Sequence, residues 1–244
     1  MKYINNICNE ENFTCEKTTI WRFKDRGRWS VHSGAYRGNW SPYVPRNLIL
    51  KYSDAHDWVL DQFVGGGTTA IEAALLRRNF IGIDINENAI KLSQSNISKV
   101  SSETRIFLQK GDATNLSCIK SDSIDLICSH PPYNDIIKYS NKIKNDLSCL
   151  CLEDFLDAMS MVANESIRVI KKGKYVSVLI ADVRKRGQLI PLGMYILNIY
   201  LKVGFTVKEI IIKEQHNCKS TKKWENRKNN FLLISHEYLF VFQK

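Results

Sequence analysis

The sequence lacks the marks of membrane and secreted proteins. No window approaches 18 consecutive apolar residues, and the amino terminus MKYINNICNEENF has acidic and amide residues where a signal peptide needs an apolar core. None of the seven cysteines forms a CxxC pair, and the nearest two, Cys149 and Cys151, flank a single leucine. We therefore expect a soluble, cytoplasmic chain with reduced thiols and no membrane association.

Acidic residues are scarce relative to basic ones, with 25 Asp and Glu against 35 Lys and Arg and a net charge of +10. This charge favours a polyanionic partner such as nucleic acid over an acidic small metabolite. An ordinary basic protein without such a partner has the same charge, so charge alone leaves both interpretations open.

No internal repeat, low-complexity linker or clean domain boundary divides the 244 residues. The hydrophobic share of 44% is enough for a core, and the length fits one large domain. We expect a single domain over residues 1–244, in which an N-terminal segment, residues 1–57, precedes an α/β core, residues 58–244.

Short apolar runs alternate with amphipathic segments along the core. The seven expected strands are WVLDQFV (58–64), FIGIDI (80–85), RIFLQKGD (105–112), IDLICS (124–129), YVSVLIAD (175–182), FTVKEIIIK (205–213) and EYLFVFQ (237–243). Expected helices cover residues 68–78, 86–100, 152–171 and 190–203. The alternation predicts an α/β fold with a mostly parallel sheet. A polar stretch without a helical pattern separates the last two strands, so we expect them to pair as an antiparallel edge.

The stretch VLDQFVGGGTTAIEA (59–73) joins an expected strand to an expected helix through glycines. The strand ends at Asp61, and Thr68 begins the helix, so a ligand can approach backbone that carries no Cβ. A phosphate-binding P-loop would need a lysine where Thr68 stands, which excludes it. A dinucleotide site, an adenosine-type cofactor without phosphates, and a plain glycine turn remain as alternatives.

Acidic residues stand at three successive strand ends. Asp61 is the first, and Asp84 in GIDINENA can accept from both hydroxyls of a ribose. Asp112 in KGDATNL can accept from the amino group of adenine, although a turn Asp is the simpler interpretation of that residue alone. Asn86 is a better helix cap than Asp84. Strand ends of an open α/β sheet meet in one crevice, so we expect the three acids to converge.

The fourth expected strand runs into Ser129-His130-Pro131-Pro132-Tyr133. Two prolines fix two φ angles and remove two backbone donors, which leaves carbonyls to accept hydrogen bonds from a substrate. An amino group held there has its lone pair oriented, and Tyr133 offers a ring for a planar base.

With these motifs the chain resembles the S-adenosylmethionine-dependent DNA amino-methyltransferases, from about residue 30 to the end. DQFVGGGTT is similar to their cofactor loop, GIDIN and GDA to their ribose and adenine acids, SHPPY to their catalytic Asp/Asn/Ser-Pro-Pro-Tyr/Phe motif, and HEYLFVF (236–242) to their final strand. The resemblance implies a Rossmann-like, class I methyltransferase fold of seven strands, methylation of adenine N6 or cytosine N4, and a restriction-modification setting.

The resemblance also implies a set of site residues. The cofactor S-adenosylmethionine is expected at Asp61, Phe63, Gly65, Gly67, Thr68, Thr69, Asp84 and Asp112. Its methionine end is expected at YRGNWSPYVPRNLI (36–49), with Ser41, Pro45 and Arg46 as candidates. The catalytic candidates are Ser129, His130, Pro131, Pro132 and Tyr133. The base would be flipped onto Tyr133, and its amino group would donate to the Pro131 carbonyl and to His130 or Ser129, with no metal.

The chain departs from the family at two points. His130 stands where the family has Asp, Asn or Ser; a neutral imidazole can accept one hydrogen bond, with Ser129 as the alternative. Nothing after Tyr133 is long enough for a separate target-recognition domain. Recognition would then come from loops, a partner subunit, a homodimer or the amino-terminal segment.

Three basic stretches mix cations with aromatics: IWRFKDRGRW (20–29), RKRG (184–187) and KSTKKWENRK (219–228). Such stretches suit a phosphate backbone with nearby bases, and solvated surface loops are the alternative. Residues 20–46 carry Arg22, Lys24, Arg26, Arg28, Arg37 and Arg46 beside Trp21, Trp29 and Trp40. An RNA amino-methyltransferase and a non-catalytic nucleic-acid-binding subunit stay open beside a DNA methyltransferase.

Overall fold

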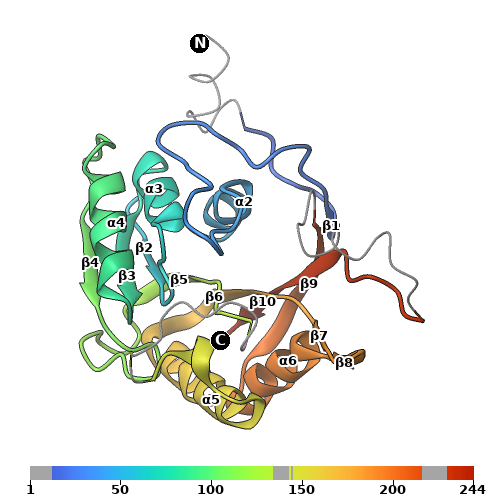
Figure 1. The fold of residues 1–244 in the computed structure, drawn as a ribbon. Helices are drawn as coiled ribbons and strands as arrows, with labels where there is room; N and C mark the ends of the chain where they lie inside the picture. The colour runs from blue at the N-terminus through green and yellow to red at the C-terminus, as the bar shows by residue number, and fades with distance from the viewer. Residues whose placement is uncertain (1–12, 134–142, 144, 216–229) are drawn as a thin grey trace.

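The computed structural model describes residues 13–133, 143, 145–215 and 230–244, and its main feature is a sheet of eight strands (Figure 1). Its strands are β1 (Ile20–Trp21), β2 (Trp58–Asp61), β3 (Asn79–Asp84), β4 (Ile106–Lys110), β5 (Ile124–Ser129), β6 (Ile170–Ile180), β9 (Thr206–Glu214) and β10 (His236–Gln243). Their order is β1-β9-β10-β6-β5-β2-β3-β4. The expected α/β fold with a mostly parallel sheet is confirmed.

Only β10 runs against the other strands of this sheet. It pairs antiparallel with both β6 and β9, whereas the remaining neighbours pair in parallel. All seven expected strands form, and the last two pair antiparallel as predicted. Their place at the edge was wrong, because the two-residue strand β1 pairs with β9 and makes an eighth strand.

Helices cover both faces of the sheet (Figure 1). They are α2 (Tyr43–Tyr52), α3 (Thr68–Leu75), α4 (Glu87–Ile97), α5 (Leu152–Val169) and α6 (Leu192–Val203), with a short 3-10 turn at Leu147–Cys149. Helices α2, α3 and α4 lie on one face, and α5 and α6 lie on the other. The four helices predicted from sequence are present, and α2 is an addition. No helix in the described part of the chain is long and apolar enough to span a bilayer.

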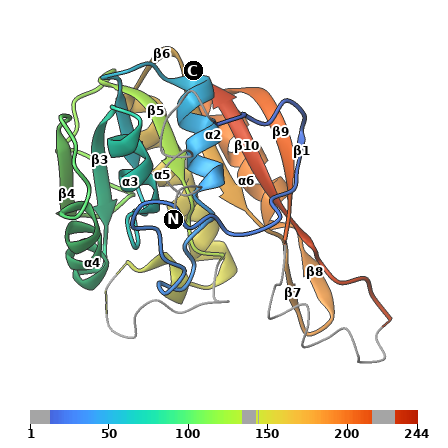
Figure 2. The same ribbon diagram turned by 90° about the horizontal axis from the view of Figure 1, so that it is seen from above.

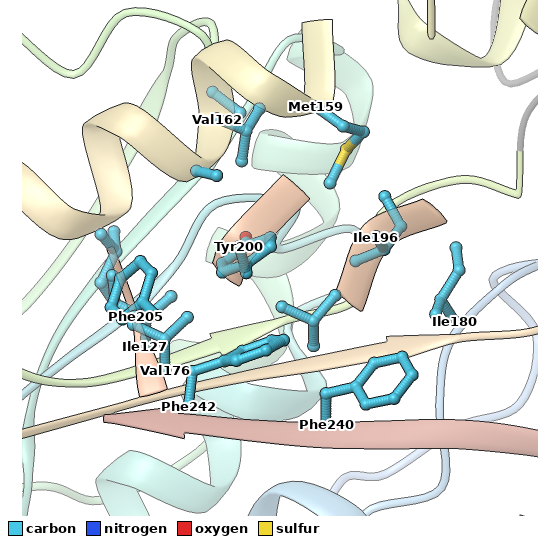
Figure 3. Close-up of a cluster of buried hydrophobic side chains, with 14 of the residues drawn as sticks. Ile127, Met159, Val162, Val176, Ile180, Ile196, Tyr200, Phe205, Phe240 and Phe242 are labelled. Atoms are coloured by element: carbon cyan, nitrogen blue, oxygen red, sulfur yellow. The ribbon is translucent and has the colours of Figure 1, made fainter. Parts of the chain in front are cut away.

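Alternation along the strands divides the core into two layers. On β10, Phe240 and Phe242 face α5 and α6 and pack with Tyr200, which Figure 3 shows, while Leu239 and Val241 face α2 and α3. Successive strand residues point to opposite faces, so one apolar strand serves both layers. Both faces being covered explains why the central strands read as continuous apolar runs.

A small hairpin projects from the carboxyl end of β6. Strands β7 (Val183–Lys185) and β8 (Gln188–Ile190) pair antiparallel and stand away from the main sheet (Figure 2). The basic stretch RKRG (184–187) covers the end of β7 and the turn of this hairpin, which is Arg186–Gly187. The hairpin therefore presents cations near the carboxyl ends of the parallel strands.

Candidate active site

The glycine loop between β2 and α3 is held in a conformation that requires glycine. Gly65 and Gly67 have φ angles of 50° and 85°, in the left-handed region. A Cβ on Gly66 would lie 2.7 Å from the Asn39 side chain. Ser93 Oγ donates to the Gly65 carbonyl at 2.7 Å. The loop is thus a fixed backbone surface at the start of α3.

Asp84, at the end of β3, supports this loop and faces the cavity beside it. Its carboxylate accepts from the backbone N–H groups of Gly65 and Asn86, both at 2.9 Å. Burial raises the pKa of Asp84, and these two hydrogen bonds oppose the shift. Each carboxylate oxygen retains capacity for a further hydrogen bond, such as one from a ribose hydroxyl. Asn86 caps α4 by accepting from the Asn88 N–H at 3.0 Å, as expected.

Asp61, at the end of β2, is almost fully buried. Its carboxyl accepts from the Thr69 hydroxyl and from the Phe63 N–H at 2.9 Å. Burial raises the pKa of Asp61 to about 7. Thr69 therefore acts on the site through Asp61, since Thr69 itself does not line the cavity.

Asp112 follows β4, and both predicted roles of this residue, in a turn and at the ligand cavity, agree with its surroundings. One carboxylate oxygen accepts from the N–H and the hydroxyl of Thr114 at 2.9 and 2.7 Å, which is a side-chain turn. The other accepts from Asn145 at 3.1 Å. Asp112 also lines the same cavity as Asp61 and Asp84. The expected convergence of three acids at three strand ends is present in the structure.

The cavity lies at the carboxyl ends of the central parallel strands. Its walls come from the amino-terminal segment, the glycine loop, the ends of β3 and β4, and the turn before α5. The loop after β5, residues 130–133, completes them and is called the proline loop below. The lining residues are Tyr36, Gly38, Asn39, Trp40, Asp61, Gln62, Phe63, Val64, Gly65, Thr68, Asp84, Ile85, Asn86, Asp112, Ala113, His130, Pro132, Asn145, Asp146 and Leu147. Carboxylates, amides and aromatic rings in one enclosed site suit an adenosine-type ligand with a polar tail.

The amino-terminal segment reaches the cavity through residues other than those singled out. Tyr36, Gly38, Asn39 and Trp40 line it, whereas Ser41, Pro45 and Arg46 do not. The Ser41 hydroxyl donates to the Arg26 carbonyl at 2.7 Å. Motif order pointed to the right segment, but α2 begins at Tyr43, three residues after Trp40, and turns Pro45 and Arg46 into the core.

Arg46, on α2, is fully buried in a charged cluster between α2 and α3. Its guanidinium contacts Glu72 at 2.8 Å and lies 5.8 Å from the ring centre of Trp29. Glu72 also accepts from Trp29 Nε1 at 2.7 Å and meets His32 Nε2 at 2.5 Å. These contacts join α2 to α3, and they place Arg46 in a structural network.

The proline loop brings His130 against two aromatic rings. Its imidazole stacks on Trp40, with ring centres 5.4 Å apart, and meets the Tyr133 ring edge-on at 5.5 Å. Burial lowers the pKa of His130 to about 4, so the imidazole is neutral at pH 7. His130 and Pro132 line the cavity; Pro131, Tyr133, Gly67 and Ser129 are not among its lining residues.

Tyr133 and Ser129 occupy different surroundings. The Tyr133 hydroxyl contacts His130 Nε2 at 2.9 Å and donates to Glu237 Oε1 at 2.8 Å. Ser129 is fully buried, and its Oγ has no hydrogen-bond partner among the described residues. Of the two candidates for holding a substrate group, His130 is the one at the cavity wall.

Three of the six amino-terminal cations, Arg22, Arg26 and Arg46, have structural partners. Arg26 donates to the carbonyls of Asn39 and Trp40 at 2.9 and 3.0 Å, so it fixes the cavity wall. Arg22 pairs with Glu214. Trp21, Trp29 and Trp40 are all buried, so these rings are not exposed to bases at the surface. Contact of this segment with a phosphate backbone stays a prediction. The stretch 219–228 lies outside the described residues.

The described side chains offer no metal site. Within residues 13–133, 143, 145–215 and 230–244, no group of three or more His, Cys, Asp or Glu side chains could hold an ion. None of the five cysteines that the structure describes forms a disulfide bond.

Comparison with known proteins places these features in context. A family model described as "Methyltransferase domain" matches residues 53–231, and one described as "DNA methylase" matches residues 4–95. The chain is similar to the type II methyltransferase M2.LlaDCHI of Lactococcus lactis, with 39% identity over 57 residues, 23% of this chain and 21% of that protein. It is also similar to a release factor glutamine methyltransferase of Clostridium acetobutylicum, with 24% identity over 139 residues, 53% of this chain and 49% of that protein.

Among solved structures, TrmN from Thermus thermophilus superposes with a TM-score of 0.59 and 20% identity, over 85% of this chain and 50% of that one. At this identity the likeness shows the fold alone. The chain spans less than half the length of either curated relative.

Proposed function

The chain belongs to the methyltransferase domain family, and we propose that it transfers a methyl group from S-adenosylmethionine to an exocyclic amino group of adenine or cytosine in DNA. The match of residues 4–95 to the DNA methylase model supports DNA as the substrate. One observation carries the proposal: a single cavity joins the strand-end acids Asp84 and Asp112 to the proline-loop residues His130 and Pro132.

The cofactor half of the cavity contains groups that match an adenosine ligand. Asp84 would accept from the ribose hydroxyls, and Asp112 would accept from the adenine amino group. The glycine loop would lie against the ligand, and Asn39 and Tyr36 would hold its amino-acid end. When bound, the cofactor supplies an electrophilic methyl group on a sulfonium.

The substrate half orients the nucleophile. The amino group of a flipped base would donate to His130 and to the carbonyl of Pro131, which directs its lone pair toward the methyl group. A neutral His130 is needed for this, because an imidazolium has no acceptor nitrogen. The amino proton leaves to water after transfer.

The nucleic acid would approach the carboxyl ends of the parallel strands, where the cavity lies. Arg37, which stands between two cavity residues, and Arg186, in the β7–β8 turn, are exposed there. Such cations would contact phosphates and give affinity without sequence preference. We infer one methyltransferase domain over residues 1–244, with target choice supplied by loops, a partner subunit or a second copy, in the reducing cytoplasm.

The test is transfer of tritiated methyl to unmethylated genomic DNA, followed by nucleoside analysis. Label in N6-methyldeoxyadenosine or N4-methyldeoxycytidine from the DNA is the expected result. An Asp84→Ala protein is the negative control. Label in transfer RNA alone would favour an RNA enzyme, and cofactor binding without transfer to any nucleic acid would favour a non-catalytic subunit.

A second candidate follows from the similarity to a release factor glutamine methyltransferase. That relative, matched over 139 residues, is named for methylation of a glutamine, whose side-chain amide is another planar nitrogen acceptor. The same loop could hold such an amide. The net charge of +10 favours DNA, and adding purified release factor to the same assay separates the two.

A further inference from the structure

A chain of hydrogen-bonded side chains runs from the last two strands to His130. Lys213 Nζ contacts Glu237 Oε2 at 2.5 Å, Glu237 Oε1 contacts the Tyr133 hydroxyl at 2.8 Å, and this hydroxyl contacts His130 Nε2 at 2.9 Å. Lys213 and Glu237 are directly opposite each other in the β9–β10 ladder. Strand register therefore fixes the far end of the chain.

The direction of each hydrogen bond follows from counting protons. A lysine ammonium only donates, and an ionised carboxylate only accepts. Although burial alone would raise the pKa of Glu237, the charge of Lys213 and the hydrogen bonds from Lys213 and Tyr133 lower it overall, so Glu237 is ionised. The single Tyr133 hydroxyl proton is committed to Glu237, and the contact between Tyr133 and His130 requires a proton on His130 Nε2.

We propose that Glu237 and Tyr133 are positioning residues that hold His130 in its Nε2–H tautomer, which makes Nδ1 the acceptor for the substrate amino group. This inference rests on the proposed function. The imidazole lines the cavity, and the structure gives its Nδ1 no hydrogen bond to any described residue. Stacking on Trp40 fixes the plane of the ring.

The opposite tautomer would be unproductive. With the proton on Nδ1, an N–H would face the N–H of the substrate amino group, and two donors cannot share a hydrogen bond. In the productive tautomer, the nitrogen–carbon bond forms as the carbon–sulfur bond breaks and its electron pair stays on sulfur. The surplus amino proton passes to water, because His130 is too weak a base to keep it.

Glu237→Gln reverses the chain at constant size. Lys213 continues to donate to the side-chain oxygen, which turns the amide NH₂ toward Tyr133. The Tyr133 proton must then point to His130 Nε2, and His130 takes the Nδ1–H form. Tyr133→Phe keeps the ring but removes the hydroxyl, so His130 should populate both tautomers. Tyr238→Phe, on the neighbouring residue of β10, is the matched control.

Nitrogen NMR of the full chain labelled at histidine reads the tautomer directly, without cofactor or substrate. We expect a proton on Nε2 in the unmodified protein and in Tyr238→Phe, and on Nδ1 in Glu237→Gln. Turnover should fall on the order of 100-fold in Glu237→Gln, the scale of losing one oriented hydrogen bond in a transition state, while cofactor affinity by calorimetry stays unchanged.

A proton on His130 Nδ1 in the unmodified protein would overturn the inference. An unaltered His130 tautomer in Glu237→Gln would overturn it too. If Glu237→Gln does not fold, Tyr133→Phe provides the second test. A protein that methylates DNA with His130 in the wrong tautomer refutes only the hydrogen-bond chain. A protein with the Nε2–H form that methylates no DNA refutes the proposed substrate, and with it the acceptor role of Nδ1.

Discussion

At the scale of single residues, Asp61 couples the site to the stability of the fold. Its pKa is raised from the ordinary value of 3.8 to about 7 because the carboxyl is buried. The folded state therefore binds the proton more tightly than the unfolded chain does. The stability that Asp61 contributes is fully present below pH 4 and is lost as the pH rises through about 7.

Asp61→Asn should remove this dependence. The ligand-free unmodified protein should lose stability relative to Asp61→Asn between about pH 4 and pH 7, with a constant difference above that range. His130 acts in the opposite sense, because its lowered pKa gives stability that is lost as the pH falls through about 4. Urea unfolding of both proteins over this pH range measures the two free energies of unfolding. Subtracting one from the other cancels the His130 contribution, which both proteins share. A difference that does not change with pH would show that Asp61 ionises normally.

Asp84 is the residue on which cofactor affinity should depend most directly. Asp84→Ala removes the charged acceptor expected for the ribose and leaves the Gly65 N–H without its partner. We expect S-adenosylmethionine binding to weaken by about 1–3 kcal/mol in calorimetry. Asp157→Ala, an exposed site on α5, is the control and should bind as before. Unchanged affinity in Asp84→Ala would remove this carboxylate from the cofactor site.

At the scale of elements, a buried ion pair between Arg46 and Glu72 links α2 to α3. Arg46→Met leaves Glu72 buried without its arginine, and breaking such a pair costs about 3–5 kcal/mol of unfolding free energy. Arg22→Met breaks the Arg22–Glu214 pair, in which Arg22 is exposed, and should leave the free energy of unfolding nearly unchanged. Both values come from urea unfolding. Lower cofactor affinity with unchanged stability in Arg46→Met would restore Arg46 to the ligand site.

The elements differ in how far the sequence determines them. Strands such as β5 are long apolar runs covered on both faces, so their pattern is sufficient to predict them. Strand β1 has two residues, too few for any periodicity, and it forms because β9 offers an open edge. In α2, Pro45, Arg46 and Asn47 interrupt the apolar spacing, and all three are buried by tertiary contacts.

The site was predictable where a motif sits on one strand end, as at Asp84 and His130. It was not predictable where two distant segments meet. Trp40 stacks on His130 only because the amino-terminal segment crosses the strand ends before entering α2. The Lys213–Glu237 pair depends on the register between β9 and β10, which no local pattern specifies.

At the scale of the whole molecule, the net charge is +10, exposed cations stand at both ends of the parallel strands, and the cavity lies at their carboxyl ends. Arg37 and Arg186 are exposed at the cavity edge. Lys99 follows α4, and Lys120 precedes β5, so these exposed lysines stand at the opposite side, near the amino ends of the parallel strands. The two pairs carry equal charge and differ in position.

Arg37→Gln with Arg186→Gln should therefore weaken binding to all DNA sequences about equally. The slope of log affinity against log salt should flatten by up to about two, one for each phosphate that is no longer neutralised. Lys99→Gln with Lys120→Gln lowers the net charge by the same amount and should leave the slope nearly unchanged. Fluorescence anisotropy with a duplex at several salt concentrations measures both proteins. Equal flattening would mean that net charge, and not the cavity edge, determines binding; weaker binding to one sequence alone would make these arginines readers of bases.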